Sequence, residues 1–296
     1  MIRTGVLDVH THICPPEIRR NRHAFFRGEE DFRLIYADPR ARLVGASGLV
    51  DYLDREGIRT ACAFGFPWSD DGHTRLCNDY VMEAARRYPG RIVPLACVNP
   101  LRGRAAAREA ERCLASGARG LGEIATYRAG LGEDVRAALA PLAELCREAE
   151  VPLLLHTNEP VGHAYPGKSR MEPGDLYALI RAHPHTRWIL AHWGGGLFVY
   201  HLLRREAPEV LRNVWYDTAA GPYLYRPEVY RHFVGIAGAE RLLFGSDYPL
   251  LGISRYLADM NEAGLEPDQI EAVLGGNARR LFGLEEDIPC TGPARS

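Results

Sequence analysis

The chain has 296 residues, of which 46% are hydrophobic and 25% are charged, and its net charge at pH 7 is −2. This length and composition are typical of a globular protein, built either as one large barrel or as two smaller domains. The nearly neutral charge does not favour nucleic acid or an anionic membrane, no apolar run is long enough to span a bilayer, and we expect no signal peptide before the first strand.

The seven cysteines are scattered along the chain and form no CxxC pair. This pattern favours buried or free thiols in a reducing compartment, so we predict a cytoplasmic protein. Cys14 follows shortly after a pair of histidines and is therefore a candidate for a place near a functional site.

The first predicted strand ends in that pair of histidines. Val6, Leu7 and Val9 are typical of a buried strand, and His10 and His12 follow at its carboxyl end. Residues two apart in a strand point to the same face, so both imidazoles are directed at one point. Imidazole is a good ligand for zinc and related divalent ions, although two histidines can also alternate in a strand by chance.

Short runs rich in valine, isoleucine and leucine recur along the chain and alternate with helical segments such as 105–115 and 134–150. Including the opening run, they predict eight strands, the later ones over residues 60–66, 91–98, 118–124, 151–157, 187–193, 213–218 and 241–247. Eight strand–helix units predict an α/β fold, a distorted TIM (β/α)8 barrel that forms a single domain over residues 1–296. A doubly wound open sheet is the alternative, but it would more often begin with a glycine-rich phosphate loop, which does not follow the first strand here.

Two of the predicted connections are unusually long, at about residues 14–47 and 158–172. Each follows a strand, so both are expected over the C-terminal face of the barrel, where barrel enzymes bind their substrates. His163, Tyr165 and Lys168 in the second connection could bind a substrate carboxylate, or they could be ordinary solvent-exposed loop residues.

Ionisable side chains also occur at the ends of other predicted strands. Glu123, His156, His192 and Asp247 stand at the carboxyl ends of the fourth, fifth, sixth and eighth runs, respectively. Each is therefore expected to point into the mouth of the barrel. Any one of them could be a satisfied buried polar group, but burying so many together with the histidine pair is costly unless a cation compensates them.

These motifs resemble those of the amidohydrolase superfamily, and most closely the branch called amidohydrolase family 2, which contains aminocarboxymuconate semialdehyde decarboxylase. The resemblance covers nearly the whole chain and rests on Asp8-Val9-His10-Thr11-His12, His156-Thr157, Ala191-His192-Trp193-Gly194-Gly195, Gly245-Ser246-Asp247-Tyr248-Pro249 and Gly276-Asn277-Ala278-Arg279-Arg280-Leu281-Phe282. It implies one divalent metal ion, usually zinc, with four ligands and a neighbouring catalytic imidazole. The implied ligands are His10, His12, His156 and Asp247, and the implied catalytic imidazole is His192.

Glu123 complicates this assignment. A Gly-Glu pair at the end of the fourth strand resembles the TatD-type deoxyribonuclease branch of the superfamily, in which a glutamate bridges two metals and the strand-six histidine is a ligand. The eighth strand does not resemble that branch. We therefore expect one metal, with Glu123 as an additional ligand or as a partner of the ligands, and keep a two-metal centre as the alternative.

The residues predict a metal-dependent hydrolase that attacks a small carbonyl compound, such as an amide, ester or lactone, with a metal-activated water. Asp247 would take the proton, His192 would orient or protonate the substrate, and Asp8 would hold the first strand by hydrogen bonds. The main alternative is a non-oxidative decarboxylase of an aromatic or unsaturated acid, and a less favoured one is a metal-binding barrel without catalysis. We expect a small-molecule substrate, no nucleic acid or membrane partner, and allow for a homodimer.

Overall fold

The structure is a computed structural model that describes residues 3–284, and Cys290 lies outside the described residues. The strands at its centre are β1 (Arg3–His12), β2 (Ile58–Phe64), β3 (Ile92–Pro94), β4 (Leu121–Ile124), β5 (Pro152–Leu155), β6 (Arg187–Leu190), β7 (Val214–Asp217) and β8 (Leu242–Leu243). They pair in the orders β1-β2-β3 and β4-β5-β6-β7-β8, and each of these pairs is parallel.

Backbone hydrogen bonds join these two groups of strands at both seams. Val9 N in β1 donates to Phe244 O, just after β8, at 2.9 Å. Gly122 N in β4 donates to Ala96 O, just after β3, at 2.9 Å. The chain therefore forms the distorted TIM barrel that the sequence predicts, with one seam directly beside the histidine pair.

Regular pairing is shorter than several of the predicted runs. Within the predicted run 91–98 only Ile92–Pro94 is regular strand, and within 241–247 only Leu242–Leu243. The backbone leaves the ladder before the mouth, and Asp247 reaches the left-handed region with a φ of +58°. The irregular end after β8 carries Asp247, whereas His10, His12 and Glu123 lie within the regular strands β1 and β4.

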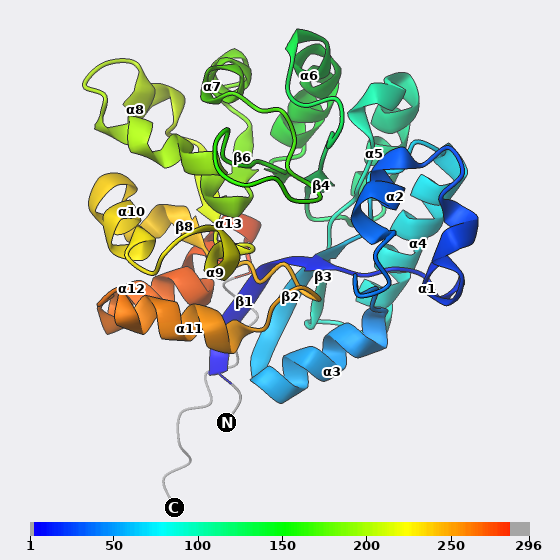
Figure 1. Cartoon of the computed structure of the whole chain (residues 1–296), viewed down its shortest axis with the longest axis horizontal. Coiled ribbons are helices and arrows are strands. Elements are labelled where there is room, and N and C mark those ends of the chain that lie inside the picture. The colour runs from blue at the N-terminus through cyan, green and yellow to red at the C-terminus, as the bar shows by residue number, and fades with distance from the viewer. Residues whose placement is uncertain (1–2, 285–296) are drawn as a thin grey trace, which may run out of the picture.

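Helices surround the strands (Figure 1). They are α1 (Pro16–Arg20), α2 (Glu30–Tyr36), α3 (Ala46–Glu56), α4 (Asp71–Arg87), α5 (Arg104–Ala115), α6 (Glu133–Glu148), α7 (Pro173–Ala182), α8 (Ala207–Val210), α9 (Gly221–Leu224), α10 (Val229–Ala237), α11 (Ile253–Glu262), α12 (Pro267–Glu271) and α13 (Asn277–Phe282). The predicted helices 105–115 and 134–150 correspond to α5 and α6. Gly117 follows α5 with a φ of +101°, a conformation that glycine adopts without strain at the end of a helix.

Strand side chains alternate between two apolar clusters. Leu154 and Ile189 belong to the cluster inside the barrel, whereas their neighbours Leu153 and Leu190 pack outward against the helices. Burying one such side chain contributes about 1.5–3 kcal/mol. Phe282 of α13 belongs to the inner cluster, so this last helix packs against the barrel interior. The strands are thus fixed from both sides, which makes their carboxyl ends rigid supports for a site.

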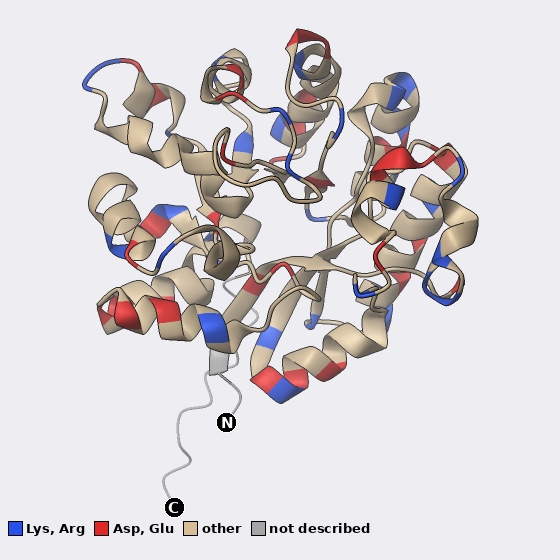
Figure 2. Cartoon of the chain, in the orientation of Figure 1, with Lys and Arg blue, Asp and Glu red and all other residues tan. Residues whose placement is uncertain are grey.

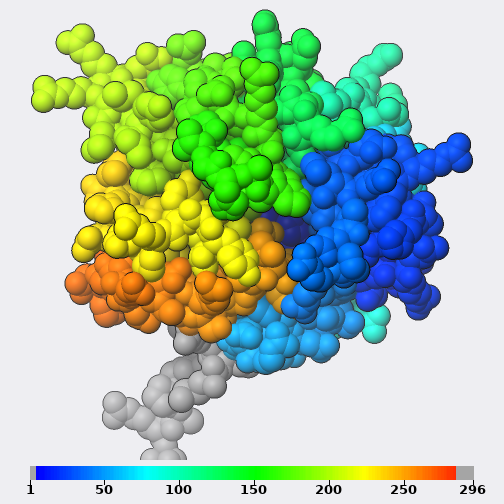
Figure 3. Space-filling model, viewed as in Figure 1, coloured from blue at the N-terminus to red at the C-terminus, as the bar shows by residue number. Residues whose placement is uncertain are grey.

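The two long connections differ in structure. Segment 14–47 contains α1 and α2, and its Phe32 packs against Phe66 and Trp68 in an apolar cluster of its own. Segment 158–172 contains no helix or strand and leads directly into α7. In the space-filling view a hollow lies between the blue segment 14–47 and the green segment 158–172 (Figure 3).

Acidic and basic residues are interspersed along the outer helices (Figure 2), as expected from the balanced composition. Between residues 3 and 284, no helix has both the length and the apolar composition needed to cross a bilayer.

Candidate metal and catalytic site

The two histidines of β1 meet the carboxylate of Asp247 at the mouth of the barrel. Asp247 Oδ1 lies 3.2 Å from Nε2 of His12 and 3.7 Å from Nε2 of His10. His10 is fully buried, and its Nε2 atom has no hydrogen-bond partner among the described residues. The three ligand atoms lie within 4.8 Å of one another. Two imidazoles and a carboxylate suit a divalent ion such as zinc, and a ligand at this point would satisfy the buried His10 nitrogen.

Glu123 stands among four imidazoles. Its Oε1 atom lies 2.9 Å from Nδ1 of His156 and 3.4 Å from Nε2 of His192. The same carboxylate lies 3.8 Å from Nε2 of His10 and 4.0 Å from Nε2 of His12. Ligand atoms of His10, Glu123 and His192 also fall within 4.8 Å of one another. This second set shares His10 with the first, so Glu123 is placed to be either an additional ligand or part of a second metal site.

His156 has both ring nitrogens against protein oxygen atoms. Nδ1 faces Glu123, and Nε2 lies 3.0 Å from the backbone carbonyl of Gly167 in segment 158–172. His156 belongs to neither compact set of ligand atoms. Its role as a metal ligand stays a prediction. To bind a metal ion, His156 would have to break its contact with either Glu123 or the Gly167 carbonyl.

His192 follows β6 and is oriented by its own backbone surroundings. Its Nδ1 atom lies 3.0 Å from the carbonyl oxygen of Ala219, which leaves Nε2 facing Glu123. The chain turns sharply here, because residues 192–196 all have positive φ angles. The turn needs glycine: a Cβ on Gly194 would lie 2.6 Å from the Tyr216 ring. The Gly-Gly of the sequence motif therefore places the imidazole of His192.

Carboxylates and imidazoles stabilise each other's charged forms in this cluster. Burial opposes ionisation of Glu123 and Asp247, but the surrounding imidazoles outweigh it and lower the pKa of Glu123 well below its usual value and that of Asp247 to about 2. Burial likewise lowers the pKa of His10, yet Asp217 and Glu123 raise it to about 10. The same carboxylate, Glu123, also raises the pKa of His192. Protons on the imidazoles thus compensate buried negative charge, and a divalent cation could take their place.

Asp217 at the end of β7 is a site residue that we did not predict from the sequence. It is fully buried, and its Oδ2 atom lies 2.8 Å from Nδ1 of His10. Its Oδ1 atom accepts hydrogen bonds from the backbone amides of His192 and Ala219, both at 2.9 Å. The sequence carried the usual signal, a carboxylate at the carboxyl end of the apolar run 213–218. The residues of this site, called the strand-end cluster below, are His10, His12, Glu123, His156, His192, Asp217 and Asp247.

Asp8 ties β1 to the end of β8, in line with the role expected from the sequence. Its Oδ1 atom accepts hydrogen bonds from the backbone amides of His10 at 3.1 Å and Ser246 at 2.9 Å. Burial raises the pKa of Asp8 to about 7. The carboxylate therefore fixes the backbone on both sides of the proposed metal ligands His10 and Asp247.

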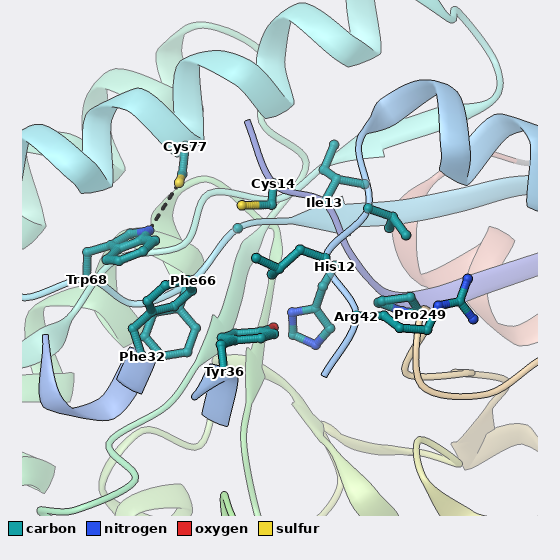
Figure 4. A pocket seen from close by; sticks show the side chains of 13 residues that line it. His12, Ile13, Cys14, Phe32, Tyr36, Arg42, Phe66, Trp68, Cys77 and Pro249 are labelled. Carbon is teal, nitrogen blue, oxygen red and sulfur yellow. Dashed lines mark hydrogen bonds between the residues drawn. The ribbon is translucent and has the colours of Figure 1, made fainter. Parts of the chain in front are cut away.

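A narrow pocket opens beside His12 (Figure 4). Aromatic side chains line it, and Tyr36 points its hydroxyl toward His12. Cys14 also lines the pocket, where burial raises the pKa of its thiol to about 12, so the thiol is protonated at neutral pH. The six cysteines among the described residues are all free and buried.

The three predicted substrate-binding residues contact their own loop. Lys168 Nζ and Tyr165 Oη both donate to the Glu159 carboxylate at 3.3 Å. Lys168 also lies 5.5 Å from the centre of the Tyr165 ring, and His163 packs near that ring while remaining exposed. None of the three has a described hydrogen bond to the strand-end cluster, so their role in substrate binding stays a prediction.

The family model for amidohydrolases, described as "Amidohydrolase", matches residues 7–284. The chain therefore belongs to the amidohydrolase family and is an enzyme of that superfamily, as the sequence motifs indicate.

Among curated proteins, the chain is 24% identical over 291 residues to gamma-resorcylate decarboxylase from Polaromonas sp. strain JS666, a match that covers 83% of this chain and 87% of that protein. The solved structure of 5-carboxyvanillate decarboxylase from Sphingomonas paucimobilis is similar, with a TM-score of 0.73, 18% identity, and coverage of 95% of this chain and 99% of that chain. The structure of dihydroxybenzoic acid decarboxylase from Polaromonas sp. JS666, with bound manganese and 2-nitroresorcinol, gives a TM-score of 0.66, 19% identity, and coverage of 95% and 97%. The structural likenesses confirm the predicted fold.

Proposed function

We propose that this protein is a metal-dependent, non-oxidative decarboxylase of an aromatic carboxylic acid. The observation that carries the proposal is the meeting of His10, His12 and Asp247 at the mouth of the barrel, where the buried Nε2 atom of His10 has no partner among the described residues. Similarity to gamma-resorcylate decarboxylase supports decarboxylation over the hydrolysis that the motifs first suggested. Hydrolysis of a small carbonyl compound is kept as the alternative.

The metal would be held by His10, His12 and Asp247, with Glu123 or His156 as a further ligand. When bound, a divalent ion would act as a Lewis acid that orients and polarises oxygen atoms of the substrate. Zinc is the ion that the sequence motifs imply, and manganese is present in one similar structure. Imidazole ligands suit zinc and carboxylates suit manganese, so both ions should be tested.

Decarboxylation breaks the bond between the ring carbon and the carboxylate, releases carbon dioxide, and requires one proton at the ring carbon. His192 is placed to hold that proton at Nε2, because the Ala219 carbonyl engages its Nδ1 atom. Asp247, whose pKa the neighbouring imidazoles lower to about 2, is ionised at neutral pH and can accept a hydrogen bond from a substrate hydroxyl. His163, Tyr165 and Lys168 would bind the substrate from segment 158–172.

The test is product analysis with the metal-loaded enzyme. Purified protein loaded with zinc or with manganese is incubated with 2,6-dihydroxybenzoate, 5-carboxyvanillate and a panel of related acids, esters and lactones. We expect carbon dioxide and the decarboxylated ring compound in equal amounts from at least one aromatic acid. Turnover of an ester or lactone with no carbon dioxide would instead establish the hydrolase alternative. No turnover across the panel despite full metal loading would favour a non-catalytic metal-binding barrel.

Metal counting separates one metal from two. We expect one ion per chain in the wild type and in His192→Ala, since His192 is proposed as an acid and not as a ligand. Two ions in the wild type, falling to one in both His192→Ala and Glu123→Ala, would establish the two-metal centre.

A further inference from the structure

The structure assigns to Asp217 a positioning role: it determines which nitrogen of His10 is free to bind the metal. This inference rests on the proposed metal site. Asp217 lies at the end of β7, fully buried, with Oδ2 at 2.8 Å from Nδ1 of His10. An ionised carboxylate can only accept hydrogen bonds, so Nδ1 of His10 must carry the proton in this pair. When a metal ion replaces the second proton of the His10 imidazolium, the lone pair is at Nε2, on the side that faces Asp247 and Glu123.

Asp217 cannot turn away from His10 easily, because its other oxygen is anchored. Oδ1 accepts from the backbone amides of His192 and Ala219, both at 2.9 Å. Gly245 packs closely beside both side chains: a Cβ on it would lie 2.8 Å from the Cβ of His10 and 3.3 Å from the Cβ of Asp217. The carboxylate therefore holds the ring of His10 in one orientation as well as in one tautomer.

The same turn after β7 also orients the proposed catalytic imidazole. The carbonyl oxygen of Ala219 lies 3.0 Å from Nδ1 of His192 and favours the proton on that nitrogen. Residues 217–219 thus face the Nδ1 atoms of both histidines and leave both Nε2 atoms directed toward Glu123. The turn after β7 therefore aligns both the proposed metal ligand His10 on β1 and the proposed acid His192 after β6, although it supplies neither group.

Two isosteric substitutions test this role. In Asp217→Asn the side-chain oxygen can still accept from His192 N and Ala219 N, and the amide group then faces Nδ1 of His10. An amide N–H can only donate, so Nδ1 must become the acceptor and the proton moves to Nε2, where it opposes metal binding. The reverse amide orientation would bring its N–H groups against two backbone N–H groups and is disfavoured. The matched control is Asp175→Asn, the same change at an aspartate of α7 that pairs with Arg136 and lies outside the strand-end cluster.

The measurement is metal affinity, obtained by chelator competition with zinc and with manganese, together with the visible absorption spectrum of the cobalt-loaded protein. Asp217→Asn should bind metal about 10–100-fold more weakly than the wild type and give an altered cobalt spectrum. Asp175→Asn should keep the wild-type affinity and spectrum. Unfolding of the metal-free variants by urea checks that both are folded.

If Asp217→Asn fails to fold, the wild type decides the question. In the zinc-loaded, ¹⁵N-histidine-labelled protein, the nitrogen shifts of His10, assigned by through-bond correlation with its own backbone amide, should show coordination through Nε2 and a proton on Nδ1. Coordination through Nδ1, or an Asp217→Asn protein with wild-type affinity and spectrum, would overturn the role of Asp217 while leaving the proposed function intact. A wild type that binds no metal would overturn the metal site itself and this inference with it.

Discussion

Polar side chains of the strand-end cluster bind partners from distant parts of the chain, whereas Glu159, Tyr165 and Lys168 of segment 158–172 bind one another. Asp217 contacts His10 across 207 residues of sequence, and Asp8, which lies next to the cluster, contacts Ser246 across 238. In segment 158–172, Lys168 bonds to Glu159 only nine residues away. The long-range contacts form only when the barrel closes and brings its strands together. The local contacts within segment 158–172 need only the loop itself.

This difference predicts how far the effect of a substitution spreads. A change in the strand-end cluster removes a contact between strands that the helices and the inner core hold rigidly, so neighbouring imidazoles lose their partners as well. A change in segment 158–172 alters a local contact at the surface. A hydrogen bond between Nε2 of His156 and the carbonyl of Gly167 joins the two regions.

The largest effect is expected for His10→Ala. Removing this imidazole takes away a proposed metal ligand and leaves Oδ2 of Asp217 without its partner. Metal content should fall from one ion per chain to almost none, and activity should be lost with it, which elemental analysis and the carbon dioxide assay measure together. Full metal content in this variant would show that the cluster does not bind the ion through His10.

The second largest effect is expected for His192→Ala, which separates catalysis from metal binding within the same cluster. Turnover should fall by about 10²–10⁴, the usual contribution of a positioned acid or base, while the metal content stays at one ion per chain. His192→Asn should be nearly as poor, because an amide cannot deliver the proton. Activity near the wild-type level in His192→Asn would assign the proton transfer to another group.

A smaller effect, on stability, is expected for Asp8→Ala. The variant leaves two buried backbone amides, those of His10 and Ser246, without an acceptor. At about 1–3 kcal/mol for each unsatisfied donor, the free energy of unfolding of the metal-free protein should fall by about 2–6 kcal/mol in urea titrations. Lys168→Ala, in the loop, should change it by less than about 0.5 kcal/mol. Equal losses in the two variants would contradict the contrast between the regions.

The sequence predicted the strands and most of the cluster because both follow from simple periodicities. An apolar run of strand length places its last polar side chain at the mouth of a barrel, and this is how His156 and Asp247 were found. Asp217 carries the same signal and was missed, since a single aspartate after Trp215 and Tyr216 has no motif around it.

Other features could not be predicted because no residue pattern encodes them. The partner of Nε2 of His156 is a backbone carbonyl, and carbonyl groups are the same in every residue. Helices α1 and α2 have five and seven residues, which is too short for a helical period to be recognised. A loop side chain such as Lys168 has several hydrogen-bond acceptors within reach, and the sequence does not indicate which of them it binds.

The smallest effect, and the sharpest test of the loop, is expected for Lys168→Ala. In the structure Lys168 pairs with Glu159, and as a substrate-binding residue it would exchange that carboxylate for the carboxylate of the substrate. Removing it should then raise KM for an aromatic acid by about tenfold with little change in kcat, the pattern of a group that binds ground state and transition state equally. Glu159→Gln is the matched variant: it weakens the hold on Lys168 without removing the ammonium group. If Lys168 binds the substrate, Glu159→Gln should leave KM unchanged or lower it. If Lys168 only stabilises the loop, the two variants break the same ion pair and should behave alike, and a shared rise in KM would therefore remove Lys168 from the substrate site.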